Sequence, residues 1–219
     1  MASLKPLTIL FQDEWLIAVD KPAGQLVHPS SHPEPEDEVT MKILRDQVGK
    51  KIRVLHRLDR PTSGVLLFAL DEKAEKQLRD DFTSKRIEKT YLAVIDGIPE
   101  TGSWTCREPL RREPESKAQD AETAFRLLQK SNQGVALVEA KPRTGRYHQI
   151  RKHLLSAGHP IVGDYRYAGI ERSDELGAKL GTGTRMLLQA KALSFEHPTT
   201  RETITIEASS DPLLESIFS

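Results

Sequence analysis

The sequence is poor in the features that mark secreted, disulfide-rich and membrane proteins. Its one cysteine, Cys106, can form neither an intramolecular disulfide nor a cysteine-based zinc site. No segment approaches the ~20 consecutive apolar residues of a membrane-spanning helix. The N-terminal residues lack the apolar stretch of a secretory signal. These absences predict a cytoplasmic protein that does not contact a membrane.

The chain also lacks a net charge, because 32 basic residues balance 32 acidic ones. The average therefore shows none of the basic excess typical of nucleic-acid binders. Residues 41–60, however, hold seven Lys or Arg against two Asp, and residues 141–153 hold five Lys or Arg and no acidic residue, so each window carries +5. The compensating acidic residues are concentrated in segments 34–38 and 202–215. The two windows are either solvated faces or two parts of one polyanion-binding site.

Length and composition indicate one globular domain. With 219 residues, 37% of them hydrophobic, the chain can bury a core without a metal or disulfide. We expect a single catalytic domain over residues 1–219, with its core at about 7–207. Strand patterns occupy 8–11, 15–19, 65–70, 91–95, 122–128, 135–140, 187–193 and 203–206. Helices between these strands, without regular βαβ alternation, predict an α+β fold with a mixed, mainly antiparallel sheet flanked by helices.

Three helices are predicted from apolar spacing. One covers 38–48, a second follows Asp71 as its N-cap, and a third lies in the second basic window and ends at Gly158. The core face of the third helix is predicted to hold Tyr147, Ile150, Leu154 and Leu155. Segment 29–38 is predicted to be a loop, and segment 101–119 a polar excursion from the domain.

Several common enzyme motifs are missing. The sequence has no G-x-x-x-x-G-K-[ST] phosphate loop, no G-x-G-x-x-G between a strand and a helix, and no G-x-S-x-G serine elbow. His148 and His153 are five residues apart, which differs from the i, i+4 spacing of an H-E-x-x-H zinc helix. The sequence therefore predicts neither a metal nor a cofactor.

Segment 55–65 places an acidic residue between a basic window and a predicted buried strand. Asp59 is flanked there by Arg57 and Arg60, and neighbouring cations favour an ionised carboxylate. Such a group can act as an oxygen nucleophile or as a base. An Asp that caps its own turn and pairs with arginine fits the same pattern, so the residue types alone leave both interpretations open.

Six motifs, in order along the chain, resemble the RluA family of RNA pseudouridine synthases from about Leu7 to Ile206. The most specific is His56-Arg-Leu-Asp59-x-x-Thr-Ser-Gly64. The others are Lys21-Pro-Ala-Gly24 with Val27-His-Pro29, Lys89-Thr-Tyr91, Pro142-x-Thr-Gly-Arg-Tyr-His-Gln-Ile-Arg-Lys-His153, His159-Pro-Ile-Val-Gly-Asp164 and Arg185-Met-Leu-Leu-Gln-Ala190. Two departures accompany the resemblance: we expect no S4 RNA-binding domain before the first motif, and Gln189 stands where relatives often have His.

The resemblance implies a reaction and three catalytic roles. Members of the family isomerise a uridine within RNA, detaching the base from C1′, turning it and rejoining it through C5, without a cofactor. Asp59 would be the catalytic carboxylate, which either attacks covalently or removes the C2′ proton to give a glycal. Tyr91 would stack on the target base and assist proton transfer, and Arg151 would be the basic partner of the catalytic Asp. A strand aromatic packed in the core is the alternative for Tyr91.

The resemblance and the local charge together imply RNA-binding residues. His148 and Lys152, at i and i+4 of the predicted helix, would share a polar flank that follows phosphates. The target uridine is expected to be flipped out of its stem. The expected RNA-binding residues are Arg57, His56, Arg60, Lys89, Arg146, His148 and Lys152.

Two other functions are weighed against this one. A glycosidase-like hydrolase usually requires two carboxylates, whereas the motifs contain one prominent acid. A non-catalytic RNA-binding protein would need Asp59 only to order its loop. The compact layout is most similar to family members that act on tRNA, so tRNA is favoured over ribosomal RNA as the partner. We expect the chain to be a monomer.

Overall fold

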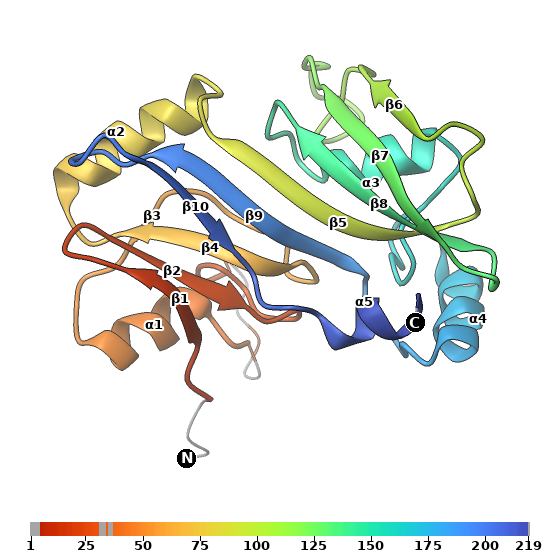
Figure 1. Cartoon of the computed structure of the whole chain (residues 1–219), viewed down its shortest axis with the longest axis horizontal. Helices are drawn as coiled ribbons and strands as arrows, with labels where there is room; N and C mark the ends of the chain where they lie inside the picture. The colour runs from red at the N-terminus through yellow and green to blue at the C-terminus, as the bar shows by residue number, and fades with distance from the viewer. Residues whose placement is uncertain (1–4, 31–33, 35–36, 219) are drawn as a thin grey trace. The chain divides into compact units, whose positions relative to one another are not determined.

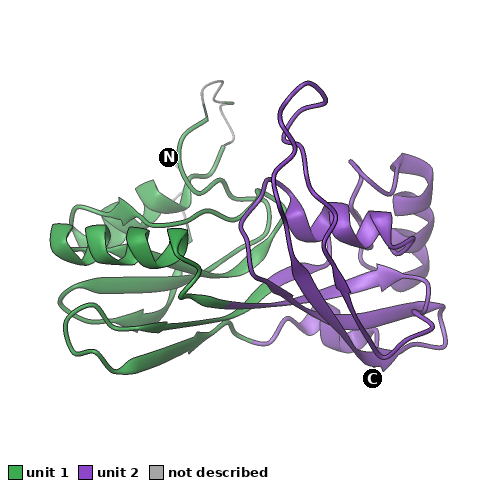
Figure 2. Ribbon diagram, turned by 90° about the horizontal axis from the view of Figure 1, so that it is seen from above, with its two compact units in different colours: residues 1–88, 190–209 green, residues 89–189, 210–219 purple. Residues whose placement is uncertain are grey.

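The computed structural model describes residues 5–30, 34 and 37–218. It divides into two compact units (Figure 2). Unit 1 comprises residues 1–88 and 190–209, and unit 2 comprises residues 89–189 and 210–219. Each unit has its own cluster of buried apolar side chains. Helices in the described part of the chain are all too short or too polar to span a bilayer.

Unit 1 combines a mainly antiparallel sheet with two helices (Figure 1). Its elements are β1 (Thr8–Gln12), β2 (Leu16–Lys21), α1 (Thr40–Val48), β3 (Arg53–Val54), β4 (Ser63–Ala69), α2 (Glu72–Thr83), most of β9 (Leu188–Glu196) and β10 (Thr203–Glu207). The strand order is β1-β2-β4-β9, with β3 paired to β4 and β10 paired to β9. The register of β2 on β4 places Lys21 opposite Gly64, next to the segment that carries Asp59.

The central strand and the second helix of unit 1 follow from local sequence. Every residue of β4 is buried, as its continuous apolar run predicts. The Asp71 side chain accepts hydrogen bonds from the backbone amides of Lys73 and Ala74, which confirms the predicted N-cap. Ala74 and Leu78 of α2 are buried in the apolar cluster that β2 and β4 share.

Unit 2 is a second antiparallel sheet with three helices (Figure 1). Its elements are β5 (Glu88–Asp96), β6 (Ser103–Cys106), β7 (Thr123–Lys130), β8 (Val135–Pro142), α3 (Gln149–Ser156), α4 (Ile170–Leu180) and α5 (Pro212–Ser216). The strand order is β5-β8-β7-β6. The predicted β7–β8 hairpin forms around Gly134, whose φ of 79° requires the left-handed region.

The structure confirms the predicted fold class and corrects the predicted core face of the third helix. Tyr147 precedes α3 and is half-buried, and Leu155 is 38% exposed, so neither lies on the core face of that helix. Segment 101–119 is not purely irregular, because it contains β6. Helix α4 was not predicted. The predicted loop 29–38 lies partly outside the described residues.

Candidate active site

The segment that carries Asp59 connects β3 to β4 in unit 1 and is anchored at both ends. Leu55 and Leu58 are buried. The Asp59 carbonyl accepts a hydrogen bond from the Thr62 amide at 3.0 Å, which closes a turn around Pro61. The Asp59 side chain is half-buried. The backbone around the carboxylate is therefore held by contacts that do not depend on that side chain.

Lys21 ties this turn to the first motif. Its side chain is fully buried, and its ammonium donates hydrogen bonds to the carbonyl oxygens of Pro22 and Gln25, each at 2.8 Å, and of Arg60 at 3.2 Å. A buried ammonium is costly unless its donors are satisfied, so these three carbonyls fix the relative position of the two segments. The Gly24 amide adds a hydrogen bond to the Arg60 carbonyl at 2.8 Å.

Gly64 explains why the motif ends on glycine. Its φ is +107°, and a Cβ at this position would lie 2.2 Å from the carbonyl oxygen of Ala190. Any side chain would therefore clash with the β9 backbone as well as strain its own. The close approach fixes the distance from β4 to β9 just after the turn that carries Asp59.

Cations of the first basic window are partly neutralised by acidic residues from other segments. The Arg60 guanidinium lies 3.1 Å from the Asp37 carboxylate, and its Nε donates to the Gly24 carbonyl. Arg53 pairs with Glu75 at 3.2 Å. Asp37 therefore neutralises an arginine of the Asp59 motif directly. The sequence indicated only that the acidic residues of segment 34–38 lie outside the basic window.

His56 and Arg57, which precede Asp59 in the same motif, differ in their surroundings. The Nε2 of His56 accepts a hydrogen bond from the Leu67 amide at 3.0 Å, and its ring stacks on Phe82 with centroids 4.7 Å apart. Arg57 is exposed. His56 therefore joins the loop to β4 and α2, whereas Arg57 is accessible to a ligand.

Unit 2 contains Tyr91 and Lys89 on β5. Tyr91 lies opposite Ala140 of β8, and its half-buried ring packs against the apolar cluster that includes Ile150. The Lys89 ammonium donates to the Thr144 carbonyl at 3.4 Å. Burial lowers the pKa of Lys89. Strand β5 thus contacts the start of the basic segment at residues 142–153.

Arg151 of α3 forms a buried, bidentate ion pair with Asp164. Its Nε lies 2.7 Å from one carboxylate oxygen and its Nη2 lies 2.8 Å from the other, and the two side chains are 6% and 1% exposed. The guanidinium also lies 5.0 Å from the centre of the Tyr167 ring. Two parallel hydrogen bonds fix the plane of a guanidinium. The resemblance implied that Arg151 is the partner of the catalytic Asp, which stays a prediction; within unit 2 its carboxylate partner is Asp164.

The turn before α3 is organised by Gln149. Its Oε1 accepts hydrogen bonds from the Thr144 hydroxyl at 2.6 Å and the Arg146 amide at 3.0 Å, and its Nε2 donates to the Glu122 carbonyl and the Thr123 hydroxyl. The Arg146 guanidinium also donates to the Asp120 carbonyl. These contacts join the turn to the start of β7 and set the direction in which α3 begins.

His148 is the N-cap of α3 and has left-handed backbone, with φ of 55°. Its ring stacks on Tyr147 at 3.7 Å between centroids, and its Nδ1 lies 3.0 Å from the Tyr167 hydroxyl. Burial, together with the positive charges of Arg151 and Arg166, lowers the pKa of His148 to about 3. His148 is therefore an uncharged ring at the start of α3, one turn before Lys152, whose amide donates to the His148 carbonyl.

Comparison with known proteins adds a decisive observation to this geometry. A model of the RNA pseudouridylate synthase family matches residues 15–156, more than half of the chain. The chain belongs to this family. It is therefore an RNA pseudouridine synthase, an isomerase that forms pseudouridine in RNA.

Relatives of this synthase cover nearly its whole length. A protein of Vibrio parahaemolyticus named tRNA pseudouridine synthase C is 39% identical over 97% of this chain and 94% of that protein. A protein of the same name from Haemophilus influenzae is 38% identical over 94% of this chain and 93% of that protein. The solved structure of human RNA pseudouridylate synthase domain containing 1 matches with a TM-score of 0.79 at 26% identity, over 99% of this chain and 88% of that one.

Three residues that support the synthase site were not predicted: Lys21, His153 and Asp164. Each is a buried polar residue with more than one hydrogen bond. Lys21 and Asp164 are buried and lie within two of the six motifs. The signal available in the sequence was that each is a charged residue inside a motif. His153 is fully buried, with Nδ1 2.9 Å from the Thr123 hydroxyl and Nε2 3.1 Å from the Glu108 carbonyl. Since a carbonyl only accepts, Nε2 carries a proton, and burial lowers the pKa of His153, which favours the neutral ring.

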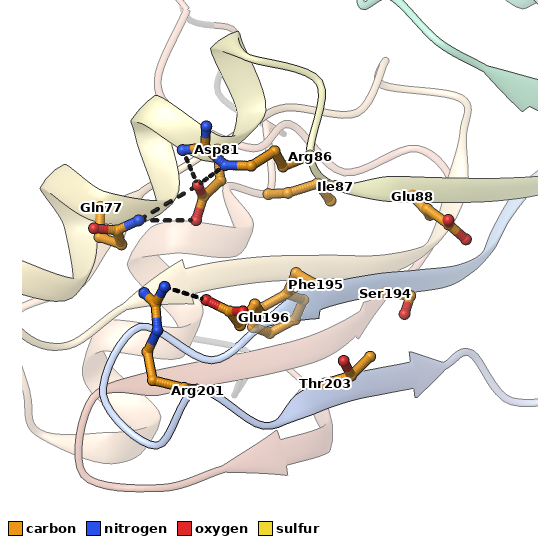
Figure 3. A pocket seen from close by; sticks show the side chains of 10 residues that line it. All are labelled: Gln77, Asp81, Arg86, Ile87, Glu88, Ser194, Phe195, Glu196, Arg201 and Thr203. Atoms are coloured by element: carbon orange, nitrogen blue, oxygen red, sulfur yellow. Dashed lines mark hydrogen bonds and ion pairs between the residues drawn. The ribbon is translucent and has the colours of Figure 1, made fainter.

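A cavity of about 490 Å³ lies in unit 1 of the synthase, and none of its lining residues is one predicted for the site (Figure 3). It is lined by Gln77, Asp81, Arg86, Ile87, Glu88, Ser194, Phe195, Glu196, Arg201 and Thr203. The Arg86 Nε lies 2.7 Å from Asp81, and Arg201 lies 2.6 Å from Glu196. Four of the five charged lining residues therefore neutralise one another in pairs, which leaves Glu88.

The buried neutral state of His148 predicts acid sensitivity of the synthase. Below pH 6.5 the unfolded chain binds a proton at this histidine, whereas the folded protein does not until about pH 3, so stability falls as the pH falls through this range. Because His148 is only half-buried, solvent screening reduces the full linkage value, and between pH 7 and pH 5 urea unfolding is expected to show a loss larger by up to about 1 kcal/mol for the wild type than for His148→Asn, which tolerates left-handed backbone. Equal losses of unfolding free energy in the two proteins would show that His148 is not the source of the acid sensitivity.

Proposed function

We propose that this synthase converts a uridine of tRNA into pseudouridine and that Asp59 is its catalytic carboxylate. The observation that carries the proposal is the similarity, over 97% of the chain, to a protein named tRNA pseudouridine synthase C. The nine-residue motif around Asp59 supports the choice of carboxylate. Ribosomal RNA is the second candidate substrate, because the family match itself specifies RNA and no particular class of RNA.

The local structure of the Asp59 turn supports a catalytic role. A catalytic group must be held in position before substrate arrives, because a small displacement lowers the rate strongly. The Lys21 ammonium, the Thr62 amide and the close contact of Gly64 with β9 supply that rigidity. The carboxylate either attacks the substrate or removes the C2′ proton. In both routes the C1′–N1 bond breaks, a C1′–C5 bond forms and the proton from C5 is released.

Tyr91 and Arg151 complete the proposed catalytic set. The half-buried Tyr91 ring packs on the core through part of its surface, which fits a side chain that offers the remainder to a flipped-out base. Arg151 is held in one orientation by Asp164 and supplies a fixed positive charge. The reaction conserves every atom and electron of the nucleoside except for exchange of the C5 proton with solvent, so we propose that it proceeds without a cofactor.

The proposed RNA-binding residues fall into two groups. Arg57 is exposed, and Lys152 is half-exposed. His56, Arg60, Lys89, Arg146 and His148 each contact a neighbouring backbone or side-chain group in the protein. We propose that Arg57 and Lys152 bind phosphates directly, although the Lys152 ammonium also donates to the Arg111 carbonyl, and that the second group mainly shapes the loops that present RNA to the site.

Release of tritium from [5-³H]uridine-labelled RNA tests the proposed substrate. The C5 proton is lost when the base rejoins through C5, so each turnover releases one tritium. Purified tRNA and purified ribosomal RNA, both from cells that lack the gene, are compared at equal uridine concentration. Release is expected from tRNA only. Release from ribosomal RNA alone would transfer the proposal to that substrate, and free uracil as a product would indicate a hydrolase.

Tyr91→Phe tests the role of the tyrosine hydroxyl. Loss of a positioned proton-transfer group typically slows a reaction by about 10²-fold, whereas the phenyl ring retains stacking. We therefore expect single-turnover tritium release to slow by about 10–100-fold with RNA affinity nearly unchanged. Tyr165→Phe is the control, because its hydroxyl bonds only to the exposed Asp174. Unchanged turnover in Tyr91→Phe would remove the hydroxyl from the reaction.

A further inference from the structure

Three cationic side chains of unit 2 gather around the ring of Tyr147. The Arg112 guanidinium lies 5.7 Å from the ring centre, the Lys152 ammonium 5.5 Å and the Arg166 guanidinium 5.9 Å. The three come from separate segments: the β6–β7 connection, helix α3 and the turn after Asp164. We call Arg112, Lys152, Arg166 and Tyr147 the Tyr147 cluster.

The imidazole of His148 covers one face of the Tyr147 ring. The imidazole stacks on it at 3.7 Å between centroids, with an interplanar angle of 21°. Because His148 is neutral, it adds no charge to the cluster. The Tyr147 hydroxyl also lies 3.4 Å from an Arg166 nitrogen, which donates to it. A tyrosine placed in this way orders cations rather than offering an open face for a base.

The cations of the cluster are not neutralised. Arg112 and Arg166 are exposed, and within the described residues none of the three cations forms an ion pair with a carboxylate. The nearest opposing influence is Glu113, whose charge raises the pKa of Lys152. Burial and the charges of Arg166 and Arg151 outweigh it and lower that pKa. Three like charges held together, with no carboxylate bonded to them, form a site for an anion.

The cluster is also held in place by the protein. The Lys152 ammonium donates to the Arg111 carbonyl, which joins the β6–β7 connection to α3. Arg166 follows directly on Tyr165 and the buried Asp164, whose ion pair with Arg151 fixes this turn. The three cations are therefore arranged before any ligand binds, which reduces the entropic cost of binding.

We propose that the Tyr147 cluster binds a phosphodiester group of the RNA backbone, at a nucleotide other than the target uridine. Guanidinium and ammonium groups bind phosphate through charge-assisted hydrogen bonds. The cluster follows in sequence on the proposed RNA-binding residue Arg146 and includes Lys152. The proposal rests on the proposed function only in taking RNA as the substrate. Two of its residues, Arg112 and Arg166, lie outside every motif that supports catalysis.

The test is the double variant Arg112→Ala/Arg166→Ala, assayed with labelled tRNA. It removes two exposed positive charges and leaves α3 and the buried Arg151–Asp164 pair intact. We expect KM to rise ~10-fold with kcat within about twofold of the wild type. The slope of log Kd against log salt, measured by filter binding, is expected to become shallower by about 1.5, since each lost phosphate contact contributes about 0.7–0.9.

Four further variants distinguish the cluster from a general effect of positive charge. Lys130→Ala/Lys179→Ala removes the same charge beside the β7–β8 turn, where Lys179 donates to the Gln133 carbonyl, and is expected to change KM by less than about twofold. Arg112→Lys/Arg166→Lys should retain the salt slope. Tyr147→Leu should weaken RNA binding by ~3-fold, whereas Tyr147→Phe should keep wild-type affinity.

The phosphate site would be overturned by either of two outcomes in the binding measurements, or by the kinetic outcome given after them. One is an unchanged KM and salt slope in Arg112→Ala/Arg166→Ala, and the other is the same change in the Lys130→Ala/Lys179→Ala control. A fall in kcat at constant KM would also contradict it. Filter binding does not need turnover, so the site is tested even if tRNA is not the substrate. Absence of tritium release from the wild-type protein would instead count against the proposed function.

Discussion

Replacing Asp59 with alanine is expected to lower tritium release from labelled tRNA by at least about 10³-fold, because the proposed reaction has no other carboxylate to begin it. RNA affinity is expected to stay within about threefold of the wild type. The turn is held by backbone and apolar contacts, with Leu55 and Leu58 buried and the Thr62 amide bonded to the Asp59 carbonyl. Alanine at this position should therefore leave the fold intact.

Two further variants make the Asp59 result specific. Asp59→Asn keeps the size of the side chain but cannot supply an anionic oxygen, so it should be as inactive as Asp59→Ala. Asp46→Ala removes an exposed carboxylate of α1 that pairs with Arg45, and should retain wild-type activity. Unfolding midpoints of all four proteins are compared first. An Asp59→Ala protein that is folded and active at the wild-type rate would exclude Asp59 as the catalytic carboxylate.

Replacing Asp164 with alanine is expected to cause the largest loss of stability, about 3–5 kcal/mol in the free energy of unfolding. The variant leaves the Arg151 guanidinium, only 6% exposed, without its bidentate carboxylate. A buried charge without its counter-charge is strongly destabilising. Loss of orientation at Arg151 should also slow tritium release in whatever fraction remains folded. Urea unfolding at pH 7 measures the first effect.

The chain contains a matched control for this experiment. Arg172 and Asp96 form an equally short bidentate pair, with both nitrogen–oxygen distances at 2.7 Å, but Arg172 is 43% exposed. Asp96→Ala is expected to cost about 1 kcal/mol or less, because exposed ion pairs contribute little. Arg151→Met/Asp164→Ala should regain part of the stability lost in Asp164→Ala, since no unpaired charge remains. Similar losses for Asp96→Ala and Asp164→Ala would show that burial of the pair is unimportant.

Elements set by local signals were predictable from the sequence. The Asp71 cap and the β7–β8 turn at Gly134 each depend on one residue whose chemistry fixes the backbone around it. Strand β6 depends instead on a distant contact, because Trp104 stacks on Phe125 of β7. Helix α4 likewise relies on packing, since a Cβ at Gly177 would lie 2.2 Å from the Gly183 carbonyl oxygen. Neither contact leaves a periodic pattern in the sequence.

In the candidate site, too, some features were predictable from the sequence and others required the structure. Motif order identified Asp59, Tyr91 and Arg151 as candidates, and their catalytic roles stay predictions. The ion pair of Arg151 with Asp164 joins residues 13 positions apart through a turn, and that of Arg60 with Asp37 joins two loops. Spacing does not reveal such pairs. Similarly, the apolar appearance of Tyr147 indicated a core residue, whereas the structure surrounds its ring with cations.

The most direct test of the central claim is a map of pseudouridines in total RNA from cells without the gene, complemented by either the wild-type or the Asp59→Asn allele. We expect deletion to remove pseudouridine from a tRNA position, the wild-type allele to restore it, and the Asp59→Asn allele, expressed at an equal level, to leave it as uridine. Restoration by Asp59→Asn, or a map unchanged by deletion, would contradict the account.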